Sequence, residues 1–350
     1  MARADKPVLL VGGVGGENAE EVLRMVGAEV GDLAIGLTDG ETGARKFWVM
    51  YLWENVLQNH PDLVFHPTSN AGYGELPKFS VAEGVETVRF EGLGYAGFAT
   101  ESYGTFKRLQ GEGVIPEGTR FQVCIPFPED AMRLPTSTER DFRILEAAYS
   151  DAVKREVTKI AAAIPAEELV IQWDVNWELI AIELDDGGKE EPLGYRLDGR
   201  PLERFAGYLQ DLSSAVPAAA KMGIHLCYGD FGHQHYIQPE NLEVCALMAK
   251  RALQSTAHPV DFCHMPVPRD RSDDAYFAPL DGLDLGTTRL YIGLVHFTDG
   301  LEGSLKRLEV FRRHYSGPAG VATECGMGRR PVDQDMKKLL RIHRELAERI

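Results

Sequence analysis

The chain of 350 residues lacks any apolar run of about 18 residues and lacks an excess of basic residues. We therefore expect neither a membrane-spanning helix nor a signal peptide, and interpret the protein as cytoplasmic. Lys and Arg number 37 against 53 Asp and Glu, which gives a net charge of −16. Because such a charge repels phosphate backbones and anionic lipid heads, nucleic acid and membranes are not expected partners.

Cysteine is scarce, and the five residues form an odd number: Cys124, Cys227, Cys245, Cys263 and Cys325. Without an export signal, this pattern favours free thiols, metal ligands or a nucleophile over a disulfide framework. We interpret Cys124, Cys245 and Cys263 as core residues. The chain also lacks a Ser/Gly-rich linker, an internal repeat and a low-complexity tract, so we expect one domain over residues 1–350.

Short aliphatic runs alternate with segments of helical periodicity along most of the chain. Eight such β/α units predict a single α/β domain, a (β/α)₈ TIM barrel. The alternative is an open doubly wound sheet, but the glycines at 12–16 do not have its G-x-G-x-x-G spacing. The expected strands are 8–11, 33–37, 121–125, 169–173, 223–228, 260–264, 290–296 and 320–323, and the expected helices include 18–26, 138–163, 202–222, 239–253 and 333–349.

Residues 53–107 do not fit this alternation and are rich in glycine and aromatic residues. We interpret them as an elaborated connection between the second and third strands, an insertion or lid that folds over the site. Its aromatic side chains suggest an apolar or aromatic moiety in the pocket, or else only packing within the segment.

Polar residues follow most of the expected strands, where the active site of a (β/α)₈ barrel lies. Asp230, His296 and Asp299 are candidates for proton transfer or for orienting an acid or base, although hydrogen bonding to the backbone is an equal alternative for His296. The candidate substrate-binding residues are Asp39, Glu41, Asp174, Asn176 and Glu178, with a simple turn as the alternative for the first two.

His225 and Cys227 are two residues apart in an expected strand, so both side chains point to the same face. Zn²⁺ binds such a nitrogen and sulfur pair when one or two more ligands complete the site. Cys325, after the last strand, can close the site from across the barrel. His264 is the expected fourth ligand, with Glu324 as a less favoured substitute.

In the order of four segments, the chain resembles the C-terminal catalytic barrel of cobalamin-independent methionine synthase. These segments are the glycine loop at residues 12–16, Gln172-Trp173-Asp174, His225-Leu226-Cys227-Tyr228 and Glu324-Cys325-Gly326. That family belongs to the uroporphyrinogen-decarboxylase-like superfamily. The resemblance implies that His225, Cys227 and Cys325 bind a zinc ion that activates a thiol, and that Asp174 helps to bind an amino-acid substrate. His264 stands where the family has a zinc-binding glutamate.

The leading prediction is a zinc-dependent enzyme that transfers a methyl or other alkyl group to or from a zinc-activated thiol on a small substrate. A zinc-dependent hydrolase or carbon–carbon lyase acting on a small carbonyl compound is the first alternative, because a neutral imidazole in place of a carboxylate makes the ion a stronger Lewis acid. A metal-free decarboxylase-like or binding barrel is the second alternative. The expected partner is a small thiol, aromatic or carbonyl compound, and a homo-oligomer is possible.

Overall fold

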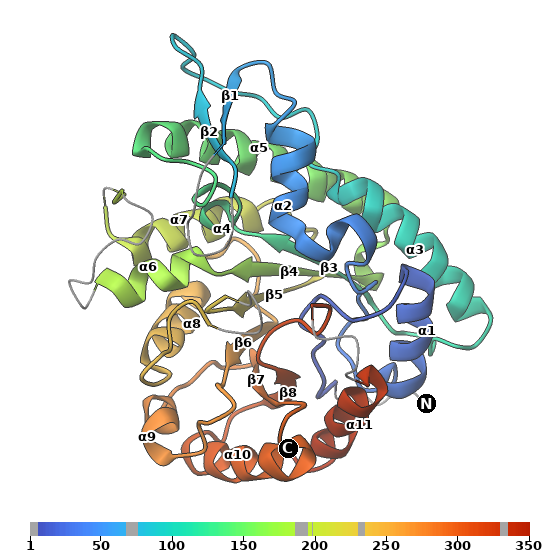
Figure 1. The fold of residues 1–350 in the computed structure, drawn as a ribbon. Helices are drawn as coiled ribbons and strands as arrows, with labels where there is room; N and C mark the ends of the chain where they lie inside the picture. Colours follow the sequence, from blue (N-terminus) through green and yellow to red (C-terminus); the bar gives the residue numbers. More distant parts are fainter. Residues whose placement is uncertain (1–5, 68–75, 186–194, 198, 230–234, 330–334) are drawn as a thin grey trace.

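The computed structural model describes residues 6–67, 76–185, 195–197, 199–229, 235–329 and 335–350. Its centre is a six-stranded parallel sheet in the order β3-β4-β5-β6-β7-β8, with helices packed around it (Figure 1). The fold is therefore mixed α/β. The strands are β3 (Phe121–Pro126), β4 (Leu169–Val175), β5 (Lys221–Leu226), β6 (Phe262–Pro266), β7 (Arg289–Val295) and β8 (Ala319–Thr323).

Six of the eight expected strands are confirmed, with ends shifted by no more than two residues. Their aliphatic and aromatic side chains are almost all buried, which is typical of a parallel sheet covered by helices. Parallel pairing aligns the carboxyl ends, for example Asp174 with His225 and His225 with His264. The polar residues that follow these strands therefore share one end of the sheet.

A closed eight-stranded barrel is not shown by the described residues, because segments 8–11 and 33–37 form only isolated parallel bridges. Val8 bridges both Ala34 and Val321 of β8, and Leu37 bridges Phe121 of β3. These bridges link the two edges of the sheet through single residue pairs.

Two interior side chains explain why the first segment does not continue as a strand. Gln122 of β3 donates a hydrogen bond to the carbonyl oxygen of Leu10, and Gln172 of β4 donates one to the carbonyl oxygen of Val11. These amides bind carbonyl groups that a regular ladder would use. Gly12 then leaves the extended region, with a φ of 135°.

The helices cover the sheet as the periodicity predicts, and side chains cap the first turns of two of them. Asn18 caps α1 and Thr138 caps α5 through their side-chain oxygens. The prediction for 202–222 was too long, because α7 ends before Pro217, which has no backbone N–H.

The helices are α1 (Ala19–Val30), α2 (Trp48–Leu52), α3 (Tyr95–Gly111), α4 (Pro128–Met132), α5 (Glu139–Ala163), α6 (Trp177–Asp185), α7 (Pro201–Ser213), α8 (Glu243–Ser255), α9 (Asp274–Phe277), α10 (Gly300–His314) and α11 (Met336–Ala347). The short helical turns are η1 (Gly43–Phe47), η2 (Trp53–Leu57), η3 (Ala166–Glu168) and η4 (Ala278–Leu280).

The segment 53–107 contains η2, an antiparallel hairpin of β1 (Leu63–His66) and β2 (Lys78–Val81), and most of α3. The hairpin projects from the sheet in Figure 1. Phe79, Phe90 and Tyr95 are about 1% exposed, so these aromatic side chains pack inside the protein. Within the described part of the chain, no helix is both long and apolar enough to cross a membrane.

Candidate metal centre and substrate pocket

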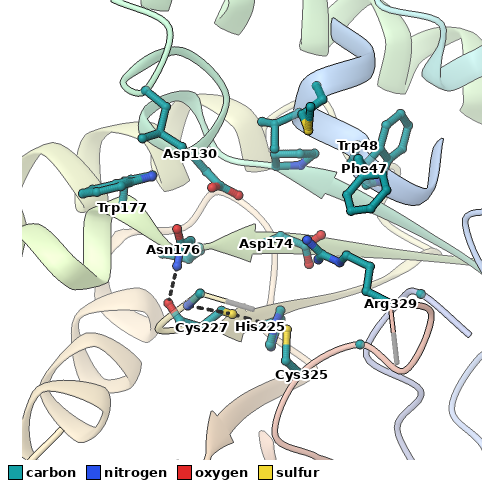
Figure 2. Close-up of a pocket in the computed structure, with 18 of the residues that line it drawn as sticks. Phe47, Trp48, Asp130, Asp174, Asn176, Trp177, His225, Cys227, Cys325 and Arg329 are labelled. Carbon is teal, nitrogen blue, oxygen red and sulfur yellow. Dashed lines mark hydrogen bonds between the residues drawn. The ribbon is translucent and has the colours of Figure 1, made fainter. Parts of the chain in front are cut away.

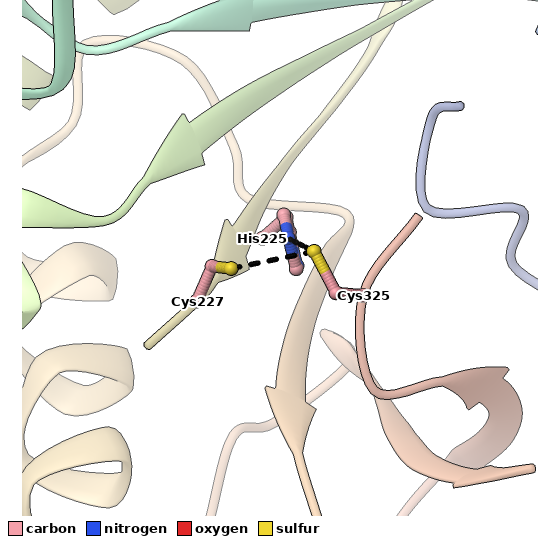
Figure 3. Close-up of side chains that lie close together, drawn as sticks. All are labelled: His225, Cys227 and Cys325. Atoms are coloured by element: carbon pink, nitrogen blue, oxygen red, sulfur yellow. Dashed lines mark hydrogen bonds between the residues drawn. The ribbon is translucent and has the colours of Figure 1, made fainter. Parts of the chain in front are cut away.

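Three potential metal ligands meet at the carboxyl end of the sheet (Figure 3). His225 lies on β5, Cys227 directly follows it, and Cys325 lies two residues after β8. The two Sγ atoms are 3.4 Å apart, and Cys325 Sγ is 3.8 Å from His225 Nε2. The sulfur separation is far above the disulfide length of about 2.05 Å. It is near the tetrahedron edges, roughly 3.5–3.8 Å, that follow from normal Zn–S and Zn–N bond lengths.

His264 lies behind His225 rather than beside the sulfurs. Its Nε2 is 3.0 Å from the carbonyl oxygen of Thr323, and its Nδ1 is 2.8 Å from His225 Nδ1. Burial lowers the pKa of His264 to about 4 and lowers that of His225 well below its usual value, so both rings are neutral. In the tautomer in which His264 Nε2 donates to the Thr323 carbonyl oxygen, His264 Nδ1 accepts from His225 Nδ1, and the backbone of Leu226 also contacts this ring.

With His264 in this tautomer, the hydrogen-bond chain also sets the tautomer of His225. Its Nδ1 carries the proton, and its Nε2 faces Cys325 with a free electron pair. A metal-binding histidine commonly has this arrangement, with the second nitrogen held by a neighbouring group. The structure therefore does not bring His264 together with the two sulfurs, and gives it a position from which it orients His225.

Main-chain contacts hold both cysteines in place. The backbone N–H of Gly229 donates to Cys227 Sγ at 3.3 Å, a contact that suits a thiolate. The Cys325 loop is fixed by Thr323, whose hydroxyl donates to the Cys325 carbonyl oxygen, and by the N–H of Met327, which donates to the carbonyl oxygen of Gly13. The glycine loop after residues 8–11 therefore supports the Cys325 loop.

Carboxylates line the pocket that opens beside these sulfurs (Figure 2). Asp174 accepts a hydrogen bond from Gln172, and Glu41 accepts one from the indole N–H of Trp48. Burial raises the pKa of Glu41 to about 7, with Arg45 opposing the shift. Burial, followed by the nearby charge of Glu41, raises the pKa of Asp174 well above its usual value.

Glu41 has a φ of 52°, and among the described residues it is the only non-glycine residue with a positive φ. This backbone strain aims its side chain at the glycine loop, and strain of this kind often marks a functional position. Glu41, Asp174 and Cys124 place one ligand atom each within 4.8 Å of one another. Cys124, interpreted as a core residue, is indeed buried but lies against this acidic pair.

Asp130, which the sequence analysis missed, is a third carboxylate in the same pocket (Figure 2). It lies on α4, four residues after the end of β3. Burial raises its pKa to about 7, and the charge of Arg329 opposes this shift. The rule that strand ends carry the chemistry would have found Asp130 had it been applied to the third strand.

Aromatic side chains form the remaining walls of the pocket, and most lie outside the segment 53–107. Trp177 begins α6 and packs against Tyr236 with ring centroids 5.0 Å apart. Phe47 and Trp48 face them from the junction of η1 and α2 (Figure 2). The aromatic residues of the pocket are Phe47, Trp48, Trp53, Trp177 and Tyr236, with Leu76 and Leu134 among the aliphatic ones.

Several predicted substrate or catalytic residues do not line this pocket. Asp39 forms a buried ion pair with Arg45, 2.5 Å long. Glu178 is fully buried and accepts a hydrogen bond from the backbone N–H of Glu129. Both therefore hold elements together. Asn176 does line the pocket and donates to the carbonyl oxygen of Cys227.

Among the predicted residues that follow the seventh and eighth strands, Asp299, His296 and Glu324 do not line this pocket. Both oxygens of Asp299 accept hydrogen bonds from the buried Arg307. His296 contacts the carbonyl oxygen of Val267 at 2.8 Å and lies 3.4 Å from Glu324. Glu324 also lies 3.5 Å from His235 and lines a second, separate cavity. The predicted Asp230 lies outside the described residues.

Comparisons with known proteins support the fold. No family model matches the chain, and no curated protein matches it in sequence. A B12-independent methionine synthase from Shewanella sp. W3-18-1, solved with selenomethionine, has a similar structure with a TM-score of 0.62. The match has 13% identity and covers 99% of this chain and 98% of that chain. A xylose isomerase domain protein from Alicyclobacillus acidocaldarius subsp. acidocaldarius matches only weakly, with a TM-score of 0.24, 16% identity, and coverage of 66% of this chain and 88% of that chain.

Proposed function

We propose that this protein is a zinc-dependent transferase that moves a methyl or other alkyl group to or from the thiol of a small substrate. The observation that carries the proposal is the triad of His225, Cys227 and Cys325. Two of its separations, 3.4 and 3.8 Å, lie within roughly 0.4 Å of the edges of a zinc tetrahedron. The structural similarity to a methionine synthase supports an enzyme of this fold.

The chain's own residues would prepare the site for this reaction. His225, Cys227 and Cys325 would hold the zinc, and His264 with the Thr323 carbonyl group keeps His225 Nε2 unprotonated. When bound, zinc lowers the pKa of a thiol and so keeps it a nucleophilic thiolate at neutral pH. Two cysteine thiolates and a neutral imidazole leave a coordination position for a substrate sulfur.

Glu41 and Asp174 would bind a cationic group of the thiol substrate, such as an amine. Both line the pocket beside the sulfurs, and neither forms an ion pair with another described residue. A cation placed between them would favour their ionised forms and offset their mutual repulsion. Asn176 would help to shape the floor of the pocket, which is the part formed by Glu41 and Asp174, because its side-chain amide donates to the Cys227 carbonyl oxygen.

The first test is elemental analysis of protein purified without added metal. We expect about one zinc per chain in the native protein and almost none in Cys227→Ser and Cys325→Ser variants. Cys263→Ala is the matched control, since Cys263 is buried on β6 outside the triad. Absence of zinc, or zinc retained in both serine variants, would refute the proposal. Alkylation of thiols by the loaded protein then tests the reaction.

A zinc-dependent hydrolase or carbon–carbon lyase is the second candidate. Asp130 favours it, because a pKa of about 7 suits an acid or base that works near neutral pH. Turnover of small esters or ketones without any thiol would distinguish this function from the first.

We also propose that segments 8–11 and 33–37 act as the first two strands of a barrel that forms one domain. Within this domain, residues 53–107 would act as a lid over the pocket. The bridges of Val8 and Leu37 to the edge strands support the first point, and Trp53 and Leu76 in the pocket wall support the second. A cytoplasmic location and a small-molecule partner stay predictions.

A further inference from the structure

The described side chains that line the pocket include more acidic than basic groups. Three carboxylates, Glu41, Asp130 and Asp174, line it, while Arg329 is the only Lys or Arg among its described lining residues. Glu41 and Asp174 lie together on the floor beside the glycine loop and Cys124. Asp130 projects from another element, α4, above Asn176 (Figure 2). The pocket therefore has an acidic position that the binding of a thiol substrate on the floor does not use.

Asp130 also differs from the other two carboxylates in its contacts. Asp174 and Glu41 each accept a side-chain hydrogen bond, from Gln172 and Trp48. No described residue donates a hydrogen bond to the Asp130 carboxylate, although the charge of Arg329 acts to lower its pKa. A half-buried carboxylate without donors is poorly stabilised as an anion, and a cation in the pocket would stabilise it.

Aromatic side chains form much of the wall of the pocket that holds Asp130. Trp177 and Tyr236 meet at an interplanar angle of 57°, which forms an angled corner. Trp48 and Phe47 lie on the other side of the pocket (Figure 2). Aromatic faces combined with a carboxylate are the surroundings that bind a cation without N–H donors, such as a quaternary ammonium group.

We propose that the alkyl donor of this enzyme is a cationic onium compound, a methylated sulfonium or quaternary ammonium, held by Asp130 and the aromatic corner of Trp177 and Tyr236. This inference rests on the proposed thiol alkyl transfer. It assigns a chemical class to the donor, which the acidic pocket selects against anionic donors such as phosphate esters.

The reaction of such a donor needs no further reactant. The thiolate electron pair of the acceptor forms a new C–S bond with the donor's methyl carbon. The old C–S or C–N bond breaks, and its electron pair stays on the leaving sulfide or amine, which becomes neutral. The cationic charge is lost in this step, so Asp130 and the aromatic corner bind the donor more strongly than the product.

Binding to the zinc-loaded protein is tested with choline and its neutral isostere 3,3-dimethyl-1-butanol, which differ only in charge at the branched centre. By calorimetry, we expect choline to bind at least about tenfold more tightly. Asp130→Asn should weaken choline binding about tenfold and leave binding of the alcohol unchanged. Glu117→Gln is the matched control, because it removes one exposed carboxylate before β3, at the opposite end of the sheet.

Turnover is tested with trimethylsulfonium chloride and a panel of small thiols, by measuring dimethyl sulfide in the gas phase. We expect thiol-dependent dimethyl sulfide from the native protein and a KM raised in Asp130→Asn. Equal binding of choline and the alcohol, an unaffected Asp130→Asn variant, or no dimethyl sulfide with any thiol would each overturn the inference. The zinc analysis is separate: a zinc-free native protein would refute the proposed function, whatever choline does.

Discussion

The two sides of the pocket are built in different ways. The sulfur side comes from the ends of regular strands, and its side chains are fixed by a continuous set of hydrogen bonds from Thr323 through His264 to His225. The opposite side combines the turn at Glu41, Asp174 near the end of β4, the helices α4 and α6, and the η1–α2 junction. Burial raises the pKa values of its three carboxylates. The first side is preorganised without a ligand, whereas the second becomes favourable only when a ligand enters.

This difference in rigidity suggests that the sulfur side carries out the chemistry and the opposite side selects the substrate. A rigid set of ligands suits chemistry that must be the same in every turnover. A wall of carboxylates and aromatic rings, held in part by helix starts and turns, suits selection of a substrate. Changes on the sulfur side should therefore abolish metal binding, and changes on the opposite side should alter affinity while zinc remains bound.

The largest effect is expected for Cys325→Ser. A serine hydroxyl is a poor zinc ligand at neutral pH, so alkyl transfer should fall by at least about a thousandfold and zinc should be lost. Thiol alkylation and zinc content measured on the same preparation check this. Full activity in a zinc-free variant would show that the sulfur side is not the catalytic centre.

His264→Leu should weaken zinc binding by about 10–100-fold, because His225 would lose the acceptor that fixes its tautomer. Competition with a zinc-binding dye gives the affinity. His258→Leu is the matched control, since His258 is also buried but its ring nitrogens contact the carbonyl oxygens of Pro259 and Pro217. An equal loss in both variants would assign the effect to general destabilisation.

Asp174→Asn should raise the KM for the thiol substrate by about tenfold, because a charge-assisted contact becomes a neutral one. Zinc content should not change. Glu178→Gln provides the contrast, since Gln keeps an acceptor for the Glu129 backbone N–H and Glu178 lies outside the pocket. A shift in KM of the same size in Glu178→Gln would contradict the separation of roles.

The smallest effect concerns stability and pH. The pKa of Asp130 in the folded protein, about 7, is above its ordinary value of 3.8. The folded state therefore holds this proton more tightly, and stability falls as pH rises from about 4 to 7. Asp130→Asn should remove this loss, raising the free energy of unfolding by about 1–2 kcal/mol at pH 8 and by almost nothing at pH 4. Denaturant melts at the two pH values test it, and a gain at pH 4 equal to that at pH 8 would contradict it.

The sequence predicted the three residues of the sulfur side and also Glu41 and Asp174, but it missed Asp130 and the aromatic walls of the pocket. The two-residue spacing of His225 and Cys227 has a direct geometric meaning in a strand, and parallel pairing brings strand ends together. Asp130, Trp177 and Phe47 have no such spacing, because they lie on helix starts and turns. Their approach depends on how separate loops fold over one another, which periodicity does not encode.

Contacts between separate segments, which periodicity does not encode, also explain the other differences between the predictions and the structure. Glu178 follows a strand end as Asp174 does, yet it is turned into the contact between α6 and α4. His264 has a ligand's chemistry, but its Nε2 contacts the Thr323 carbonyl oxygen. Segment 8–11 has strand-like composition, and only the side chains of Gln122 and Gln172 show why its ladder is incomplete.

The bridge between Val8 and Val321 has a consequence for how the protein is made. These partners are about three hundred residues apart in the chain, so they meet only after the whole segment between them has left the ribosome. Cys325 lies just beyond Val321 and is held by the loop of Gly13. The candidate metal centre should therefore form only after Cys325 has been made, long after the segment that carries His225 and Cys227.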